Sequence, residues 1–106
     1  METLMQAVER LSRAGYDDEF VAIPEGLRAV RSGGIHDPGC LKVDEVVRFE
    51  GPSDPADESI LFALRCEVHG VKGTYATPFG PAVDALDAEA VRRLSLHEAR
   101  SRTRAG

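Results

Sequence analysis

Long hydrophobic segments and cysteines are scarce in this sequence. The longest apolar run, Ile60 to Leu64, is far shorter than the roughly 20 residues that cross a bilayer. The N-terminus METLMQAVERL lacks the basic segment and following apolar stretch of a secretory signal. We therefore expect a cytoplasmic protein that does not insert into membranes. A disulfide between its two cysteines, Cys40 and Cys66, is disfavoured in a reducing cytoplasm.

Basic residues are scarce over most of the chain. Residues 1–91 hold 17 acidic and 8 basic residues, whereas residues 92–106 hold five arginines and one glutamate. An acidic body repels phosphate backbones, so we expect no binding to nucleic acid. The arginines complement the dipole at the end of a helix, and residues 99–106 are expected to continue as a basic, frayed tail.

The length and composition are those of one globular domain. At 106 residues the chain can bury one hydrophobic core, and its content of 42% hydrophobic and 29% charged residues is ordinary for a folded protein. We therefore expect a single domain over residues 1–98.

Helix signals lie at the two ends of the chain, with strand signals between them. One helix is expected to begin after the capping residue Thr3 and to end at Gly15, and another to run from Asp84 or Asp87 to Leu96 or beyond. Alternating or β-branched apolar residues predict strands over five segments: Phe20–Ile23, Leu27–Val30, Leu41–Glu50, Ser59–Val68 and Val71–Thr77.

The connections complete the predicted fold. Residues 32–39 are rich in glycine and are read as a loop, and His69-Gly70 is read as the two-residue turn of a hairpin. We expect an α+β domain, in which a small antiparallel meander sheet of three to five strands carries the N-terminal and C-terminal helices on one face. The other face would then be available for a homodimer, with apolar residues at Val46, Leu61, Ala63 and Phe79.

No catalytic constellation is present. Ser53 and Ser59 do not lie in a nucleophile-elbow pattern. Asp54, Asp57 and Glu58 are close in sequence but lack the spaced oxygen ligands of a calcium loop, so a solvated acidic turn is the better interpretation. The sequence therefore favours a protein that is not an enzyme.

Several segments resemble a family of small bacterial proteins that is often labelled phosphoribosylpyrophosphate synthetase. The likeness spans nearly the whole chain and is carried by Gly15-Tyr16, Glu19-Phe20, Val43–Gly51, Ser53–Glu58, Leu61–Cys66, Gly73–Tyr75 and Phe79–Pro81. The label implies an acidic-flanked loop for a ribose phosphate and a site for ATP and magnesium. No segment of this sequence matches either, so we do not expect that activity.

Some members of this family carry two Cys-x-x-Cys knuckles, each closed by glycine, which together form a zinc ribbon. The matching segments here are Ala29-Val-Arg-Ser32-Gly33, which has neither cysteine, and Cys66-Glu-Val-His69-Gly70. A structural zinc site needs four ligands, so Cys66 and His69 cannot hold zinc tightly by themselves. His36 and Cys40 follow the first segment in a glycine-rich loop, and we identify them as candidates for the missing two ligands.

Two functions remain open on the sequence alone. The first is a non-catalytic binding or interaction module without a cofactor, in which Cys66 is a small core residue, His69 occupies a turn, and His36 and Cys40 are loop residues. The alternative is a zinc-binding protein with a degenerate ribbon formed by His36, Cys40, Cys66 and His69, or a protein that handles a phosphate metabolite.

Overall fold

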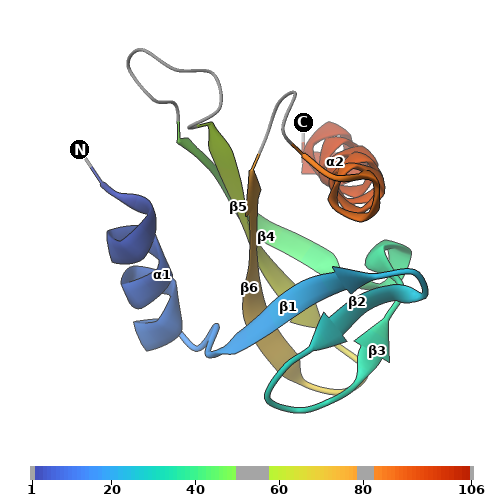
Figure 1. Cartoon of the computed structure of the whole chain (residues 1–106), viewed down its shortest axis with the longest axis horizontal. Coiled ribbons are helices and arrows are strands. Elements are labelled where there is room, and N and C mark those ends of the chain that lie inside the picture. The colour runs from blue at the N-terminus through green and yellow to red at the C-terminus, as the bar shows by residue number, and fades with distance from the viewer. Residues whose placement is uncertain (1, 50–57, 79–82, 106) are drawn as a thin grey trace.

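The computed structural model describes residues 2–49, 58–78 and 83–105 of the chain (Figure 1). Two helices lie at the ends of this α+β domain and six strands lie between them. The elements, in chain order, are α1 Leu4–Arg13, β1 Asp18–Ile23, β2 Gly26–Ala29, β3 Ile35–His36, the 3-10 helix η1 Pro38–Cys40, β4 Lys42–Phe49, β5 Ser59–Cys66, β6 Val71–Pro78 and α2 Ala85–Ala105.

All six strands belong to one sheet in the order β3-β2-β1-β6-β5-β4. The α+β class is confirmed, but the sheet is larger than predicted and is mixed, because β1 runs parallel to β6 while the other neighbours are antiparallel. The additional strand β3 lies within the segment predicted as a loop. Two residues flanked by glycines and a proline carry no alternation, so a strand this short leaves no sequence signal.

The two helices pack on opposite faces of the sheet, not on one face as predicted. Along β5, Ile60, Phe62 and Leu64 belong to the same core cluster as α2, whereas Leu61 and Ala63 pack with Ala7 and Leu11 of α1. Successive residues of a strand point to opposite faces, so a strand apolar at every position is one that is covered on both sides.

The surface predicted for a homodimer is largely covered as a result. Leu61 and Ala63 are fully buried beneath α1, and Val46 packs against the core on the α2 side. Phe79, the fourth residue of that prediction, lies outside the described residues. Self-association stays a prediction, but most of the apolar residues proposed for its interface are covered by the helices.

Both helices begin where the sequence predicts. Thr3 caps α1 in a capping box, with its hydroxyl accepting from the Gln6 amide at 3.1 Å and its own amide donating to the Gln6 side chain at 2.9 Å. Gly15 ends the turn with a φ of 106°. At α2 the carboxylate of Asp84 accepts from the backbone N–H of Asp87 at 2.9 Å.

The backbone of α2 is helical as far as Ala105 and so continues through residues 99–105, which were expected to form the tail. Fraying of this segment in solution stays a prediction. None of the helices in the described residues is both long enough and apolar enough to cross a membrane.

Candidate functional site

His36 is held at one edge of the sheet by the pairing of β3 with β2. It lies opposite Leu27, and its ring meets that of Phe20 edge to face at a centroid distance of 5.7 Å. Gly26 allows the two strands to approach, since a Cβ at that position would lie 2.5 Å from the carbonyl oxygen of His36. The imidazole is consequently 7% exposed, unlike the loop residue that was expected.

Cys66 and His69 are brought together by the turn between β5 and β6. Cys66 ends β5 with its side chain in the core, 3% exposed, and pairs with Val71 at the start of β6. The turn thus spans the four residues 67–70 instead of the predicted two. Gly70 adopts the positive φ of 70° expected of it, and its amide donates to the carbonyl of Cys66 at 2.8 Å. This turn places His69 over Cys66, with 3.4 Å between Sγ of Cys66 and Nδ1 of His69.

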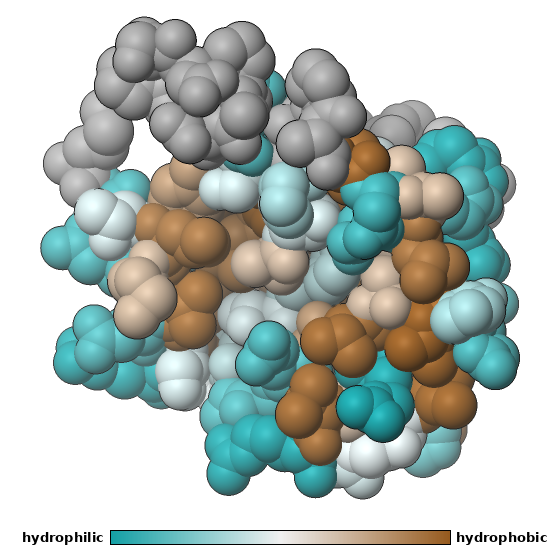
Figure 2. Space-filling model, viewed as in Figure 1, coloured by the Kyte–Doolittle hydropathy of each residue, from teal (hydrophilic) through white to brown (hydrophobic). Residues whose placement is uncertain are grey.

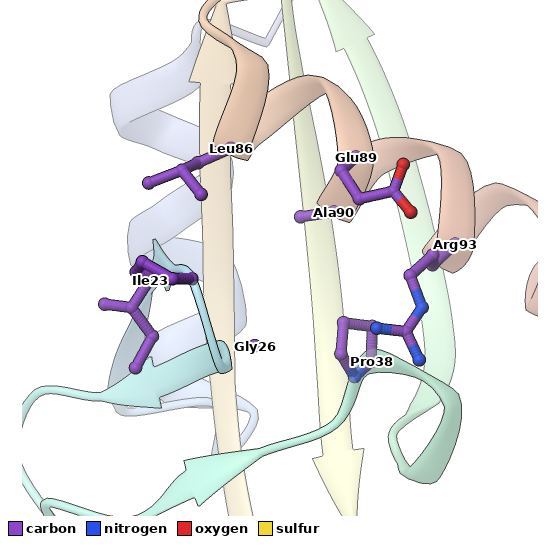
Figure 3. Close-up of a pocket in the computed structure, with 8 residues that line it drawn as sticks. Ile23, Gly26, Pro38, Leu86, Glu89, Ala90 and Arg93 are labelled. Carbon is purple, nitrogen blue, oxygen red and sulfur yellow. The ribbon is translucent and has the colours of Figure 1, made fainter.

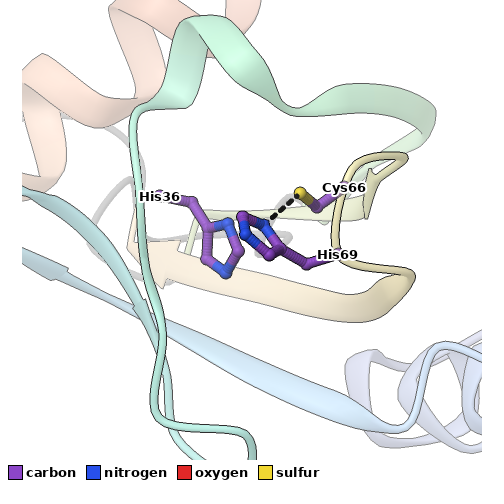
Figure 4. Close-up of side chains that lie close together, drawn as sticks. All are labelled: His36, Cys66 and His69. Atoms are coloured by element: carbon purple, nitrogen blue, oxygen red, sulfur yellow. Dashed lines mark hydrogen bonds between the residues drawn. The ribbon is translucent and has the colours of Figure 1, made fainter.

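The three side chains converge from separate parts of the chain. Cys66 and His69 approach from the β5–β6 turn and His36 from β3, and the rings of His36 and His69 lie 5.7 Å apart at 73° (Figure 4). One ligand atom from each residue lies within 4.8 Å of the other two. Tetrahedral zinc, with bonds of about 2.3 Å to sulfur and about 2.0 Å to nitrogen, would separate such atoms by roughly 3.3 to 3.6 Å. A small closure of the cluster would therefore accommodate a metal ion.

The imidazole of His36 has unmet hydrogen-bonding capacity. Its Nε2 is buried, and the described protein atoms give it no hydrogen-bond partner. Burial, assisted by the nearby His69, lowers the pKa of His36, so the ring is neutral near pH 7 and keeps a lone pair. Most buried polar side-chain atoms in folded proteins have a partner, so Nε2, which lies beside Gly34, leaves one hydrogen-bonding position of the ring unused.

Cys40, the fourth predicted ligand, is not brought to this cluster. It ends η1 with an exposed side chain and is absent from the group of metal-ligating residues found in the described part of the chain. Asp37 caps η1 by accepting from the amide of Gly39 at 2.8 Å, and Arg93 of α2 donates to the same carboxylate at 2.5 Å. These contacts fix η1 against α2.

Of the three acidic residues considered as a possible cation site, the structure describes only one. Asp54 and Asp57 lie outside the described residues, and Glu58 is half-buried just before β5. The acidic segment after α1 contains a buried carboxylate at Asp18. Burial alone would raise the pKa of Asp18, but its carboxylate accepts from the amides of Glu19, Arg31 and Ser32, and these bonds lower the pKa overall. Asp18 is therefore an anchor for the turn after β2.

The described residues line two surface hollows away from this cluster, among others. One, of about 50 Å³, lies between the β1–β2 turn and α2, where Ile23 and Gly26 face Leu86 and Ala90 (Figure 3). It is too small for an organic ligand, since drug-sized ligands occupy pockets of roughly 300 Å³ or more. The other, of about 290 Å³, is a shallow groove between α1 and β1 whose rim includes Asp17 and Glu19. Neither is lined by a residue of the His36–Cys66–His69 cluster.

Comparison with known proteins does not identify a family for this chain. A scan against protein-family models, a search of curated proteins and a search of solved structures each found no match to the chain. The resemblance drawn from the sequence motifs therefore stays an expectation, and the geometry of the cluster is the basis for assigning a function.

Proposed function

We propose that this protein is a non-catalytic module that binds one transition-metal ion through His36, Cys66 and His69. The observation that carries the proposal is the convergence of three ligand atoms, one each from His36, Cys66 and His69, within 4.8 Å of one another. A lone cysteine or histidine would carry no such weight, whereas here three ligand atoms from two distant segments meet in one place.

The chemistry of the ligands selects the class of ion. One thiolate and two imidazoles suit zinc and copper, whereas magnesium and calcium prefer oxygen ligands. Both histidines must be neutral and Cys66 must lose its proton when the ion binds, so binding releases protons and weakens as the pH falls.

An ion bound at the cluster would stabilise the fold, because its ligands come from different parts of the sheet. His36 belongs to β3, at one edge of the sheet, while Cys66 and His69 belong to β5 and the turn after it, on the far side of β2, β1 and β6 in the strand order. An ion bound to all three residues would join two parts of the sheet that are not neighbours in the strand order. Because such a site forms only in the folded state, binding stabilises the fold, by about 2.7 kcal/mol at a free ion concentration of 100 times the Kd.

Zinc provides the first test. Thermal unfolding of chelator-treated protein is measured with and without added zinc, for the wild type, His69→Ala and Cys40→Ser. His69 is exposed, so its replacement should leave the fold intact, and Cys40→Ser removes a thiol outside the cluster. We expect zinc to raise the unfolding temperature of the wild type and of Cys40→Ser and to leave His69→Ala unchanged. Equal shifts in all three proteins, or none in the wild type with either zinc or copper(I), would exclude the proposed site.

A further inference from the structure

We infer that the ion for which this site is built is copper(I), held by one sulfur and two nitrogens in a three-coordinate geometry. The inference rests on the proposed function and specifies its ion. It draws on three features of the cluster: the number of ligands, the charge that they can neutralise in a buried position, and the exposure of His69.

The number of ligands is the first argument. In the described residues the cluster contains His36, Cys66 and His69 and no further histidine, cysteine or carboxylate. Closed structural zinc sites take four protein ligands. A trigonal set of two histidines and one cysteine is instead an arrangement typical of protein copper sites. The exposed position of Cys40 removes the ligand that would complete a zinc site.

Charge is the second argument. Zinc bound to one thiolate and two neutral imidazoles leaves one net positive charge, whereas copper(I) with the same ligands is neutral. Cys66 and His36 are 3% and 7% exposed, and an uncompensated charge in such surroundings is costly. Asp18 is not among the residues that converge on the cluster, and its carboxylate is held by three backbone N–H groups. The neutral copper(I) complex therefore suits the buried part of the site better.

Exposure is the third argument. His69 lies on the solvent side of the cluster, next to Val68, which is 87% exposed at the tip of the turn. Copper(I) can reach the cluster from this side without opening the core. Binding forms a bond between copper and the sulfur of Cys66 and releases the thiol proton to solvent, while each imidazole donates a lone pair. The ion keeps its oxidation state, so no electron donor or acceptor is needed.

The test is an anaerobic titration of chelator-treated protein with copper(I) against a chromophoric copper(I) chelator. The proteins are the wild type, Cys40→Ser, His69→Ala, His36→Gln and Cys66→Ala, each checked for folding by circular dichroism. X-ray absorption of the copper-loaded wild type gives the number and type of ligands. We expect one bound copper, an affinity that Cys40→Ser leaves within about twofold, and a loss of about tenfold or more on His69→Ala. The absorption data should fit one sulfur and two nitrogens.

Three other results would overturn the copper assignment. If zinc binds at one equivalent through these residues but copper(I) affinity is the same in the wild type and His69→Ala, the metal site stands and its ion is zinc. If Cys40→Ser lowers copper(I) affinity as much as Cys66→Ala, copper is held by two thiolates and the geometry is not the proposed one. If neither ion binds, the proposed function falls as well. Because His69 is exposed, its variant decides the question even if His36→Gln or Cys66→Ala fails to fold.

Discussion

The two faces of the sheet bury very different cores. On the α2 face, aromatic and large aliphatic side chains such as Phe20, Phe62 and Tyr75 pack with Leu94. On the α1 face the fully buried residues in the described part of the chain are smaller, with Ala7 and Leu11 against Leu61 and Ala63, while Tyr16 and Phe49 are only partly buried against them. Figure 2 shows apolar residues gathered in two areas, one by α1 and one by β1, β2 and α2, with a more polar band between them. The α2 face should therefore supply most of the stability.

The two faces also differ in their polar contacts, because one on the α2 face is buried whereas those around α1 are exposed. On the α2 face the buried hydroxyl of Tyr75 donates to Asp87 at the start of the helix. Around α1 the polar contacts lie at the surface, where Arg10 pairs with Glu2 and Glu45. Buried hydrogen bonds are costly to break, whereas exposed ion pairs contribute little. The cluster of His36, Cys66 and His69 adjoins the core on the α2 side, to which Cys66 belongs.

Neighbouring substitutions in β5 measure the difference between the faces most directly. Phe62 and Leu61 are both fully buried but face α2 and α1, respectively. We expect Phe62→Ala to lower the free energy of unfolding by about 3 to 5 kcal/mol, because it also removes the stacking of Phe62 on Tyr75. Leu61→Ala should cost less, about 2 to 3 kcal/mol. Urea unfolding followed by circular dichroism measures both, and an equal or larger loss at Leu61 would refute an uneven core.

The buried hydrogen bond at the start of α2 should show the next largest effect. Burial, with the Asp87 carboxylate adding to it, raises the pKa of Tyr75, so the hydroxyl remains a donor at any ordinary pH. Tyr75→Phe removes the donor and leaves the Asp87 carboxylate short of a partner, at a cost of about 1 to 2 kcal/mol in urea unfolding. Tyr16→Phe is the matched control, because Tyr16 donates to Asp44 at the surface at 2.6 Å. A loss at Tyr16 equal to that at Tyr75 would contradict the comparison.

Alkaline unfolding tests the α1 face through Tyr16. Burial, with the hydrogen bond to Asp44, raises the pKa of Tyr16 to about 12, from an ordinary value of about 10. Between these values the folded state holds a proton that the unfolded state has lost, so this contribution to stability is complete below about pH 10 and falls as the pH rises toward about 12. Urea midpoints across this range should fall less steeply in Tyr16→Phe than in the wild type. If the urea midpoint falls equally steeply in both proteins, the loss of stability at high pH comes from groups other than Tyr16.

The fold was predictable where its signals are local. The Thr3–Gln6 capping box, Gly15 and Gly70 each mark a backbone conformation that neighbouring residues determine. The opposite placement of the helices was not predictable, because Ile60–Leu64 is apolar at every position and its alternation carries no information about faces. The parallel pairing of β1 with β6 joins segments more than 50 residues apart, as in Asp18 opposite Gly73, and no local pattern specifies it.

The site was predictable to a similar extent. The Cys66-x-x-His69 spacing on a glycine turn predicts that these two side chains meet, and the structure places them together. His36 was only one candidate in a glycine-rich loop, and its burial depends on a strand too short to predict. The sequence could not show that His36 joins the cluster and Cys40 does not. The position of η1, which carries Cys40, depends on the contact of Asp37 with Arg93, 56 residues away.

The surface contacts of α1 should give the smallest effect. Arg10 donates to both oxygens of Glu45, at 3.1 and 2.6 Å, and so links α1 to β4, but all three side chains of its network with Glu2 are more than a third exposed. We expect Arg10→Gln to shift the urea midpoint less than the other substitutions, and the shift to vanish in about 1 M salt, where the screening length is about 3 Å. Arg13→Gln makes the same change of charge one turn later and controls for net charge. If Arg10→Gln instead destabilises the protein as much as Tyr75→Phe at high salt, α1 is attached by more than its small apolar contact, and the two faces are closer in strength than their cores indicate.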